Sequence, residues 1–248
     1  MNKISELKNG KGYFQLKLKD SELESIRKIV NDHYLKNINK NYPSLEKLSK
    51  KETISNYHKI SKYIDHKKNW PMRSRTLAKK KSEKFIKLSF INELKKIFGN
   101  FKISDEYNIG HEEIYWRIVR PKKKSDVGSM HCDRWFWELN KDFTPKGKVR
   151  VKCWISLWCE GLNGLKVFPG SQLRKFKYSY ENRDGEKKPL FKLPNLDNKV
   201  KKLNCSPGTI IIFSDSLIHG GSVNNSSHTR VSIEFTMFVD KKKLVFNI

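Results

Sequence analysis

Residue types that can bind a metal stand close together in the middle of the chain. His131 and Asp133 are two positions apart, and a second histidine, His219, comes much later beside a glycine pair. Two imidazole nitrogens and one carboxylate oxygen can hold a metal from one side, which leaves its other positions open. That donor set is typical of non-haem Fe(II) sites that accept a co-substrate and dioxygen. A short His-x-Asp pair alone also occurs by chance in polar loops.

The spacing of His131 and Asp133 places both side chains on one face only if the backbone is extended there. In a β-strand the side chains at positions i and i+2 point to the same face, whereas in a helix they diverge by roughly 200°. We therefore expect a strand, or the end of one, at His131. His219 follows a predicted strand, and Gly220 and Gly221 permit the close backbone approach that a crowded metal site requires.

An arginine follows His219 after eleven positions and opens the next predicted strand. The guanidinium of this residue, Arg230, can bind a carboxylate through two parallel hydrogen bonds, which suits a dicarboxylate co-substrate better than a lysine does. Ser232 lies two residues further on, so its hydroxyl shares the face of Arg230. The pattern predicts that Arg230 and Ser232 bind the co-substrate.

The elements that must position these residues fall into two groups. The first group is mainly helical: a strand over 12–18, a helix over about 21–36 capped by Ser21 and Glu24, lysine-rich surface helices within 44–64, and one helix over 82–98. The second group consists of short runs rich in β-branched and aromatic residues, at 112–119, 149–158, 165–171, 208–215 and 229–239. Helices followed by strands predict an α+β fold, or a β-barrel with a helical flank.

The length of 248 residues suits one sizeable domain. We expect a single domain over 1–248, with a helical layer over 1–111 and a barrel core over 112–240 that carries the metal ligands. A hydrophobic content of 37% supports a packed core. The four cysteines lack paired spacing, and we expect them to remain thiols.

The chain is strongly basic, with 52 lysines and arginines against 26 acidic residues and a net charge of +26. Such a charge attracts acidic molecules, although exposed lysines can also be merely solvated. No run approaches the roughly 18 apolar residues that span a bilayer, and the first residues lack an apolar signal segment. The sequence therefore predicts a cytoplasmic protein without a membrane span.

Three further residues are candidates for contact with a substrate. Arg117 lies on a predicted strand of the barrel half, and Arg134 and Trp135 directly follow the ligand pair. Pockets are largely apolar, so an aromatic side chain at a barrel mouth can line one. The same aromatic side chain can equally serve packing.

The order His-x-Asp, late histidine and arginine resembles the phytanoyl-CoA dioxygenase-like branch of the Fe(II)/2-oxoglutarate oxygenases. The segments WISLWCEGLNGLKVFPGSQ and GTIIIFSDSLIHGGSVNNSSHTRVSIEFTMF are similar to two stretches of that family. The resemblance covers roughly residues 112–240. The chain departs from the family's pattern at Gln172, where the family often has histidine, and at Gly221, where it often has serine.

The resemblance implies a double-stranded β-helix, a jelly roll related to cupins, with helices packed on one side. It also implies that His131, Asp133 and His219 bind Fe(II), that Arg230 holds the distal carboxylate of 2-oxoglutarate, and that Trp154 faces this co-substrate. The implied reaction consumes O2 and releases succinate and CO2, with ascorbate as a useful additive in vitro. Iron halogenases of this fold lack the carboxylate, so Asp133 favours hydroxylation or a related oxidation.

Three functions are open at this point. The favoured one is a dioxygenase that hydroxylates a small anionic metabolite, such as a sugar, an acyl thioester, an amino acid derivative or a specialised metabolite. The second is a basic nucleic-acid-binding or nucleic-acid-modifying protein, although no recognition motif is evident and the lysines are scattered. The third is a non-catalytic cupin-like binding protein. The sequence does not choose the substrate or the oligomeric state.

Overall fold

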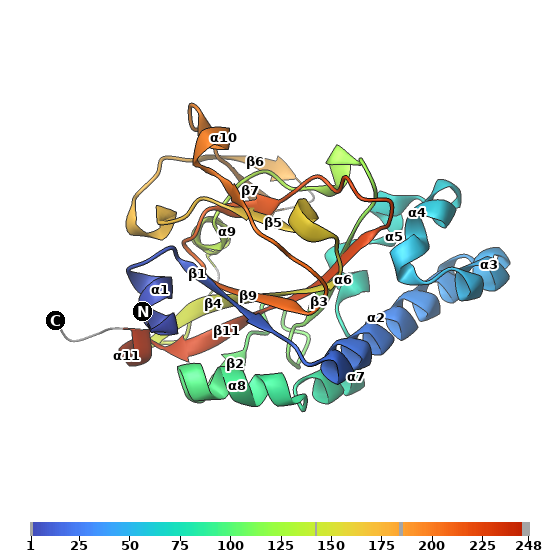
Figure 1. Cartoon of the computed structure of the whole chain (residues 1–248), viewed down its shortest axis with the longest axis horizontal. Coiled ribbons are helices and arrows are strands. Elements are labelled where there is room, and N and C mark those ends of the chain that lie inside the picture. The colour runs from blue at the N-terminus through green and yellow to red at the C-terminus, as the bar shows by residue number, and fades with distance from the viewer. Residues whose placement is uncertain (1, 142, 184–185, 245–248) are drawn as a thin grey trace.

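An antiparallel sheet forms the centre of the computed structural model, which describes residues 2–141, 143–183 and 186–244 (Figure 1). Its strands, in spatial order, are β1 (Tyr13–Lys17), β9 (Thr209–Ser214), β4 (Lys148–Trp158), β11 (Arg230–Asp240) and β2 (Lys102–Ile103), with β3 (Tyr115–Val119) also beside β11. Strands far apart in sequence are thus direct neighbours, as β1 and β9 are.

The long strands of this sheet have one apolar face and one polar face. In β11 the residues Val231, Ile233 and Phe235 are fully buried in the main core, and they alternate with Ser232 and Glu234. β4 repeats this pattern, because its aliphatic residues alternate with charged or polar ones and with a tryptophan. Successive side chains on a strand point to opposite faces, so the sequence itself creates an apolar face and a polar face.

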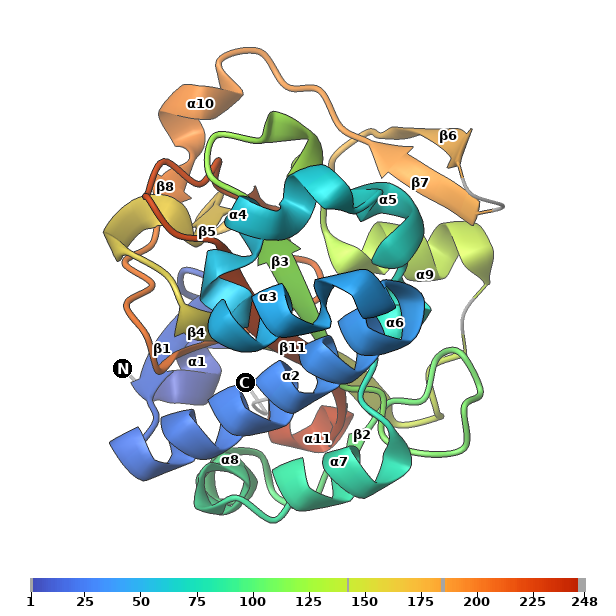
Figure 2. The same cartoon turned by 90° about the vertical axis from the view of Figure 1, so that its right-hand side faces the viewer.

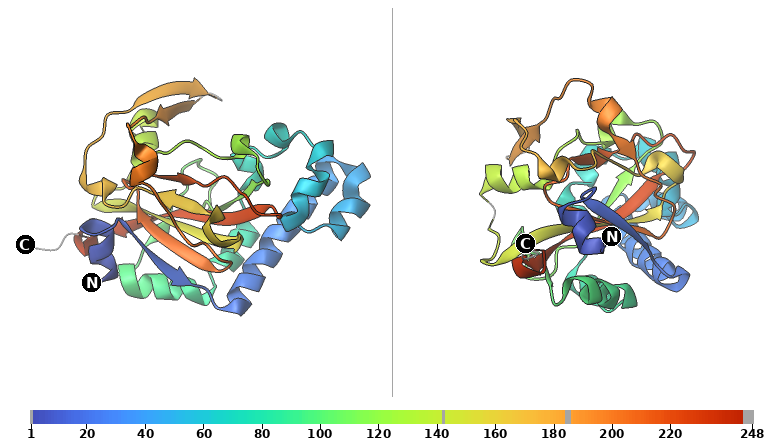
Figure 3. Two further views of the ribbon diagram at one scale, coloured as in Figure 1. Left: turned by 45° about the horizontal axis from the view of Figure 1, so that its top comes forward. Right: turned by 60° about the vertical axis from the view of Figure 1, so that its left-hand side comes forward.

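Helices cover the apolar face (Figures 2 and 3). The longest is α2 (Asp20–Asn41), which buries Ile26, Val30, Tyr34 and Ile38 at helical spacing. The other helices are α1 (Lys3–Lys8), α3 (Glu46–Lys51), α4 (Tyr57–Ile60), α5 (His66–Asn69), α6 (Met72–Arg75), α7 (Lys79–Phe85), α8 (Ser89–Phe98), α9 (Asp133–Asn140), α10 (Leu196–Lys199) and α11 (Lys241–Leu244). Of these, α9 and α10 do not cover the apolar face but lie on the side of the smaller sheet (Figure 2). None of the helices in the described part of the chain is long and apolar enough to cross a membrane.

A smaller sheet lies against the polar face of the main one. It contains β10 (His219–Gly221), β5 (Leu165–Val167) and β8 (Lys201–Lys202). Trp154 and Phe213 of the main sheet share a buried cluster with Leu165 and Val167 of the small sheet. The two sheets therefore enclose an interior that is partly polar. A separate hairpin, formed by β6 (Ser179–Arg183) and β7 (Glu186–Leu190), lies beside α9.

The helical layer differs from the sequence prediction in three places. The helix predicted over 82–98 is broken into α7 and α8, because the carboxylate of Glu22 accepts hydrogen bonds from Phe90 N and Ser89 Oγ, both at 2.7 Å, and so caps α8. The cap of α2 is Lys19, whose backbone N–H donates to Glu22, and the predicted cap at Ser21 is wrong. Within 44–64 the chain forms short helical turns instead of one or two regular helices.

Candidate metal centre

The two histidines and the aspartate meet at the edge of the small sheet. His131 and His219 form an isolated β-bridge, in which each backbone N–H donates to the carbonyl of the other, at 2.9 and 2.7 Å. Asp133 is the first residue of α9. One ligand atom from each of the three residues lies within 4.8 Å of the other two. The expected strand at the His-x-Asp pair is thus a single bridge residue, followed directly by a helix.

A hydrogen bond to a backbone carbonyl fixes the ring orientation of each histidine. His131 Nδ1 lies 2.7 Å from the carbonyl of Ser129, and His219 Nδ1 lies 3.0 Å from the carbonyl of Leu217. A carbonyl only accepts, so each Nδ1 carries the proton and donates it. Each Nε2 then presents its lone pair toward Asp133. Such outer hydrogen bonds set the tautomer and direction of metal-binding imidazoles.

The two oxygens of Asp133 have different surroundings. Oδ1 lies 3.7 Å from His131 Nε2 and 4.0 Å from His219 Nε2, which are not hydrogen-bond distances. Oδ2 is buried and has no hydrogen-bond partner. A buried carboxylate without hydrogen bonds is costly, and a cation held between these three side chains would offset that cost. The donor set, with its ligand atoms within 4.8 Å of one another, fits an Fe(II) ion.

The protonation states also suit metal binding. Burial, together with His219, lowers the pKa of His131 to about 4, so its imidazole is neutral near pH 7. Burial raises the pKa of Asp133, but the charge of Lys152 and the electrostatic interaction with the two histidines outweigh burial, and the net pKa lies below its usual range. Metal ligands must be deprotonated, and these two residues are.

Arg230 is a buried cation without an acidic partner among the described residues. It lies on the polar face of β11 and is 6% exposed. Its Nη1 donates to backbone carbonyls, at 2.9 Å to Gly164 and 2.8 Å to Ser222. Burial lowers its pKa to about 10, so it stays charged at neutral pH. A buried guanidinium of this kind fits a carboxylate of the co-substrate.

The other predicted co-substrate residues share this interior. Ser232 follows on the same face of β11 and is 1% exposed, and Trp154 projects from the same face of the neighbouring β4 and is 3% exposed. At Gly221 a Cβ would lie 3.0 Å from Arg230 Nη2 and from Val127 Cγ1. Gly221 therefore leaves room beside the guanidinium, which accounts for this departure from the family's serine.

A cavity of about 310 Å³ is lined by His131 and Asp133, two of the three candidate ligands. Arg117 lines it with a side chain that is 48% exposed, while its ion-pair partner Glu234 is only 8% exposed. The guanidinium therefore faces the cavity, and the carboxylate lies behind it. Lys188 and Glu186 of β7 form another ion pair at the wall. The wall is mixed, with aromatic rings and charges of both signs.

Arg134 and Trp135 are not among the residues that line this cavity. The side chain of Arg134 is 55% exposed and lies 3.7 Å from Asp215. Trp135 is buried and stacks on Tyr178 with ring centroids 4.6 Å apart. The next two residues of α9, Phe136 and Trp137, line the cavity instead, because successive residues of a helix point in different directions.

Lys152 and Trp137 also line the cavity, and of these two Lys152 was missed from the sequence. Lys152 could have been found, because it lies two residues before Trp154 and shares its face. The indole N–H of Trp137 is buried without a hydrogen-bond partner, while Arg150 lies over its ring at 4.1 Å. Only the fold reveals this unpaired donor.

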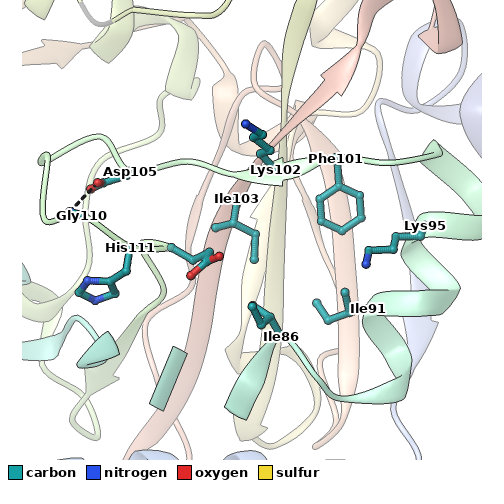
Figure 4. A pocket seen from close by; sticks show the side chains of 10 residues that line it. Ile86, Ile91, Lys95, Phe101, Lys102, Ile103, Asp105, Gly110 and His111 are labelled. Atoms are coloured by element: carbon teal, nitrogen blue, oxygen red, sulfur yellow. Dashed lines mark hydrogen bonds between the residues drawn. The ribbon is translucent and has the colours of Figure 1, made fainter. Parts of the chain in front are cut away.

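A second cavity, of about 530 Å³, is shown in Figure 4. It lies between α8 and β2, and none of the three metal-ligand candidates lines it. Two of its polar side chains are bound within the protein: Asp105 accepts from the N–H of Ile109 and of Gly110, both at 2.7 Å, and His111 Nε2 lies 3.0 Å from the carbonyl of Leu77. These bonds stabilise a loop, and the chemistry belongs to the other cavity.

Comparisons with known proteins agree with this geometry. The model of the phytanoyl-CoA dioxygenase family matches residues 35–232, and the chain belongs to this family. No curated protein matches the sequence. The family places the chain among the non-haem iron, 2-oxoglutarate-dependent oxygenases.

Solved structures of low sequence identity share the fold. The apo form of the non-heme monooxygenase ThoJ is 10% identical with a TM-score of 0.58, over 95% of this chain and 77% of that one. EctD from S. alaskensis with bound Fe is 12% identical with a TM-score of 0.56, over 95% and 75%. The epimerase SnoN in complex with Fe3+, alpha ketoglutarate and nogalamycin RO is 12% identical with a TM-score of 0.55, over 96% and 82%. The predicted jelly-roll core with helices on one side is confirmed.

Proposed function

We propose that the protein is an Fe(II)/2-oxoglutarate-dependent dioxygenase that hydroxylates a small anionic metabolite. The observation that carries this proposal is the convergence of His131, Asp133 and His219, whose ligand atoms lie within 4.8 Å of one another, with Asp133 Oδ1 beyond hydrogen-bond distance of both histidine Nε2 atoms. These three residues hold Fe(II). Arg230, with Ser232 and Trp154, holds 2-oxoglutarate.

The protein's share of the mechanism is orientation and exclusion of water. Bound iron with 2-oxoglutarate and dioxygen supplies the oxidant, and the co-substrate leaves as succinate and CO2. Arg230 orients the co-substrate from the far end of the interior, since it is a fixed cation held by backbone carbonyls. The ring of Phe213 packs on His219 at 4.5 Å and, with Trp154, keeps this interior dry.

The anionic substrate is supported by the donors that face the cavity. Arg117 presents its guanidinium there, and the N–H of Trp137 has no partner in the described structure. Both groups suit a carboxylate or phosphate oxygen. Asp133 occupies a ligand position, which favours hydroxylation over chemistry that needs that position for an anion.

The test is succinate formation by the purified protein with Fe(II), ascorbate and 2-oxoglutarate, alone and with a panel of small organic acids and phosphate esters. We expect Fe(II)-dependent succinate that at least one anion stimulates, and loss of succinate in His131→Ala and Arg230→Ala. Absence of succinate in every mixture, together with absence of Fe(II)-dependent co-substrate binding, would contradict the proposal.

A further inference from the structure

Lys152 is a buried lysine beside the metal ligands. It projects from the polar face of β4, and its side chain is 4% exposed. An ammonium group this deep requires acceptors or opposite charges around it. Its Nζ lies 3.2 Å from Thr236 Oγ1, 3.9 Å from Glu234 Oε2 and 3.9 Å from Asp133 Oδ2. Lys152 therefore connects the polar face of β11 to the carboxylate ligand.

The contacts divide the two oxygens of Asp133 between different partners. Oδ1 faces the Nε2 atoms of both histidines, whereas Oδ2 faces Lys152. Oδ1 is thus the oxygen placed to bind the metal. Oδ2 points toward a cation that is itself held in place by Thr236 and Glu234.

We infer that Lys152 is a positioning residue that keeps Asp133 a ligand through one oxygen only. This inference rests on the proposed function, because it concerns the same iron site. A carboxylate that binds through both oxygens would take a second position on the metal. By attracting Oδ2, Lys152 would keep that position free for 2-oxoglutarate.

Glu234 and Arg117 also influence the charge on Lys152. Glu234 is ion-paired with Arg117 on its other side, so its charge is shared between two cations. Lys152 is consequently not neutralised by Glu234 alone and keeps its attraction for Asp133. Without the ammonium 3.9 Å away, Oδ2 would have no cation beside it other than the metal, which it could then approach. Loss of an outer-shell partner of this kind typically costs 10 to 100-fold in affinity or activity.

The experiment uses Co(II) as the probe, because its visible absorption reports the number and arrangement of its ligands. Wild type, Lys152→Met, Lys152→Arg and the control Lys148→Met are titrated with Co(II), and then with 2-oxoglutarate. Lys148 is on the same strand but pairs with Asp240, outside the site. We expect Lys152→Met to change the Co(II) spectrum and to raise the Kd for 2-oxoglutarate by on the order of 10-fold. Lys152→Arg and Lys148→Met should resemble wild type.

A second variant guards against misfolding of Lys152→Met. Thr236→Val keeps the shape and removes the hydroxyl that holds the ammonium, so we expect the same spectral change with a smaller amplitude. Wild-type spectra and co-substrate affinity in both Lys152→Met and Thr236→Val would overturn the inference alone. A wild-type protein that binds neither Co(II) nor 2-oxoglutarate would overturn the proposed function as well.

Discussion

At the scale of single residues, the interior contains two charged groups whose natural partners are not protein side chains. Asp133 Oδ1 lies 3.7 and 4.0 Å from the two histidine Nε2 atoms, beyond hydrogen-bond distance, and Arg230 forms no ion pair with an acidic side chain in the described structure. Each group is expensive to bury alone. A divalent cation beside Asp133 and a carboxylate beside Arg230 would balance these two charges. 2-Oxoglutarate could provide that carboxylate and bind the cation at its other end.

Replacement of Arg230 tests the second half of this argument. Arg230→Gln removes a charged hydrogen-bond donor worth roughly 1.5 to 3 kcal/mol, so the Kd for 2-oxoglutarate should rise on the order of 10 to 100-fold. Calorimetric titration of the metal-loaded protein measures this. Arg134→Gln is the matched control, because Arg134 is exposed and outside the cavity. Equal co-substrate affinity in the two variants would remove Arg230 from the site.

Residue type and spacing were sufficient to select three side chains that the fold brings together, but not all residues of the cavity. Residue type and order in the sequence were enough to select His131, Asp133, His219 and Arg230 as candidates. They do not show that the indole N–H of Trp137 is buried without a hydrogen-bond partner, because that depends on how the folded chain packs. Contacts made across the fold are invisible in a local pattern.

At the scale of elements, alternation within strands was the most informative signal. The sequence of β11 alternates apolar and polar residues, and the structure buries the first set against helices and turns the second toward the site. Helix ends were less predictable. The break between α7 and α8 depends on Glu22, which lies in another helix and reaches Phe90 only in the folded chain.

The contact between α2 and β3 predicts a pH dependence of stability. The indole of Trp116 donates to His33 Nδ1 at 3.1 Å, and burial, aided by Lys81 and Lys36, lowers the pKa of His33 to about 4. Between pH 6.5 and 4 the unfolded chain binds a proton that the folded chain excludes, so the free energy of unfolding falls as pH falls through this window. We expect a contribution of about 3 kcal/mol from His33.

His33→Gln isolates this contribution, because its side-chain oxygen can accept from Trp116 but does not titrate. Denaturant titrations at several pH values should show a weaker loss of stability between pH 6.5 and 4 in the variant than in wild type. Parallel curves for the two proteins over that window would show that His33 is not the titrating group.

At the scale of the whole molecule, the excess of positive charge lies outside the cavity that His131 and Asp133 line. The lysines and arginine that line it have acidic neighbours: Arg117 with Glu234, Lys188 with Glu186, and Lys152 with Glu234 and Asp133. The net charge of +26 therefore acts mainly through the outer surface. There it draws anions toward the protein and strains the folded state by self-repulsion.

Salt should consequently stabilise the protein. The Debye length shortens from about 30 Å at 0.01 M to about 8 Å at 0.15 M ionic strength, so repulsion between distant lysines is largely screened at the higher value. We expect the Tm of the metal-free protein to rise by about a few degrees between these two ionic strengths. Scanning fluorimetry measures it, with an uncharged sugar of equal osmolarity as the control. A Tm that falls with salt would mean that local ion pairs outweigh the net charge.

The central claim is that iron bound by His131, Asp133 and His219 is chelated by 2-oxoglutarate anchored at Arg230. The most direct measurement is an anaerobic titration of the Fe(II)-loaded protein with 2-oxoglutarate, followed by visible absorption. We predict a charge-transfer band that saturates in wild type, requires a higher co-substrate concentration in Arg230→Gln, and is absent in His219→Ala. Absence of the band in wild type, or an undiminished band in His219→Ala, would contradict the account.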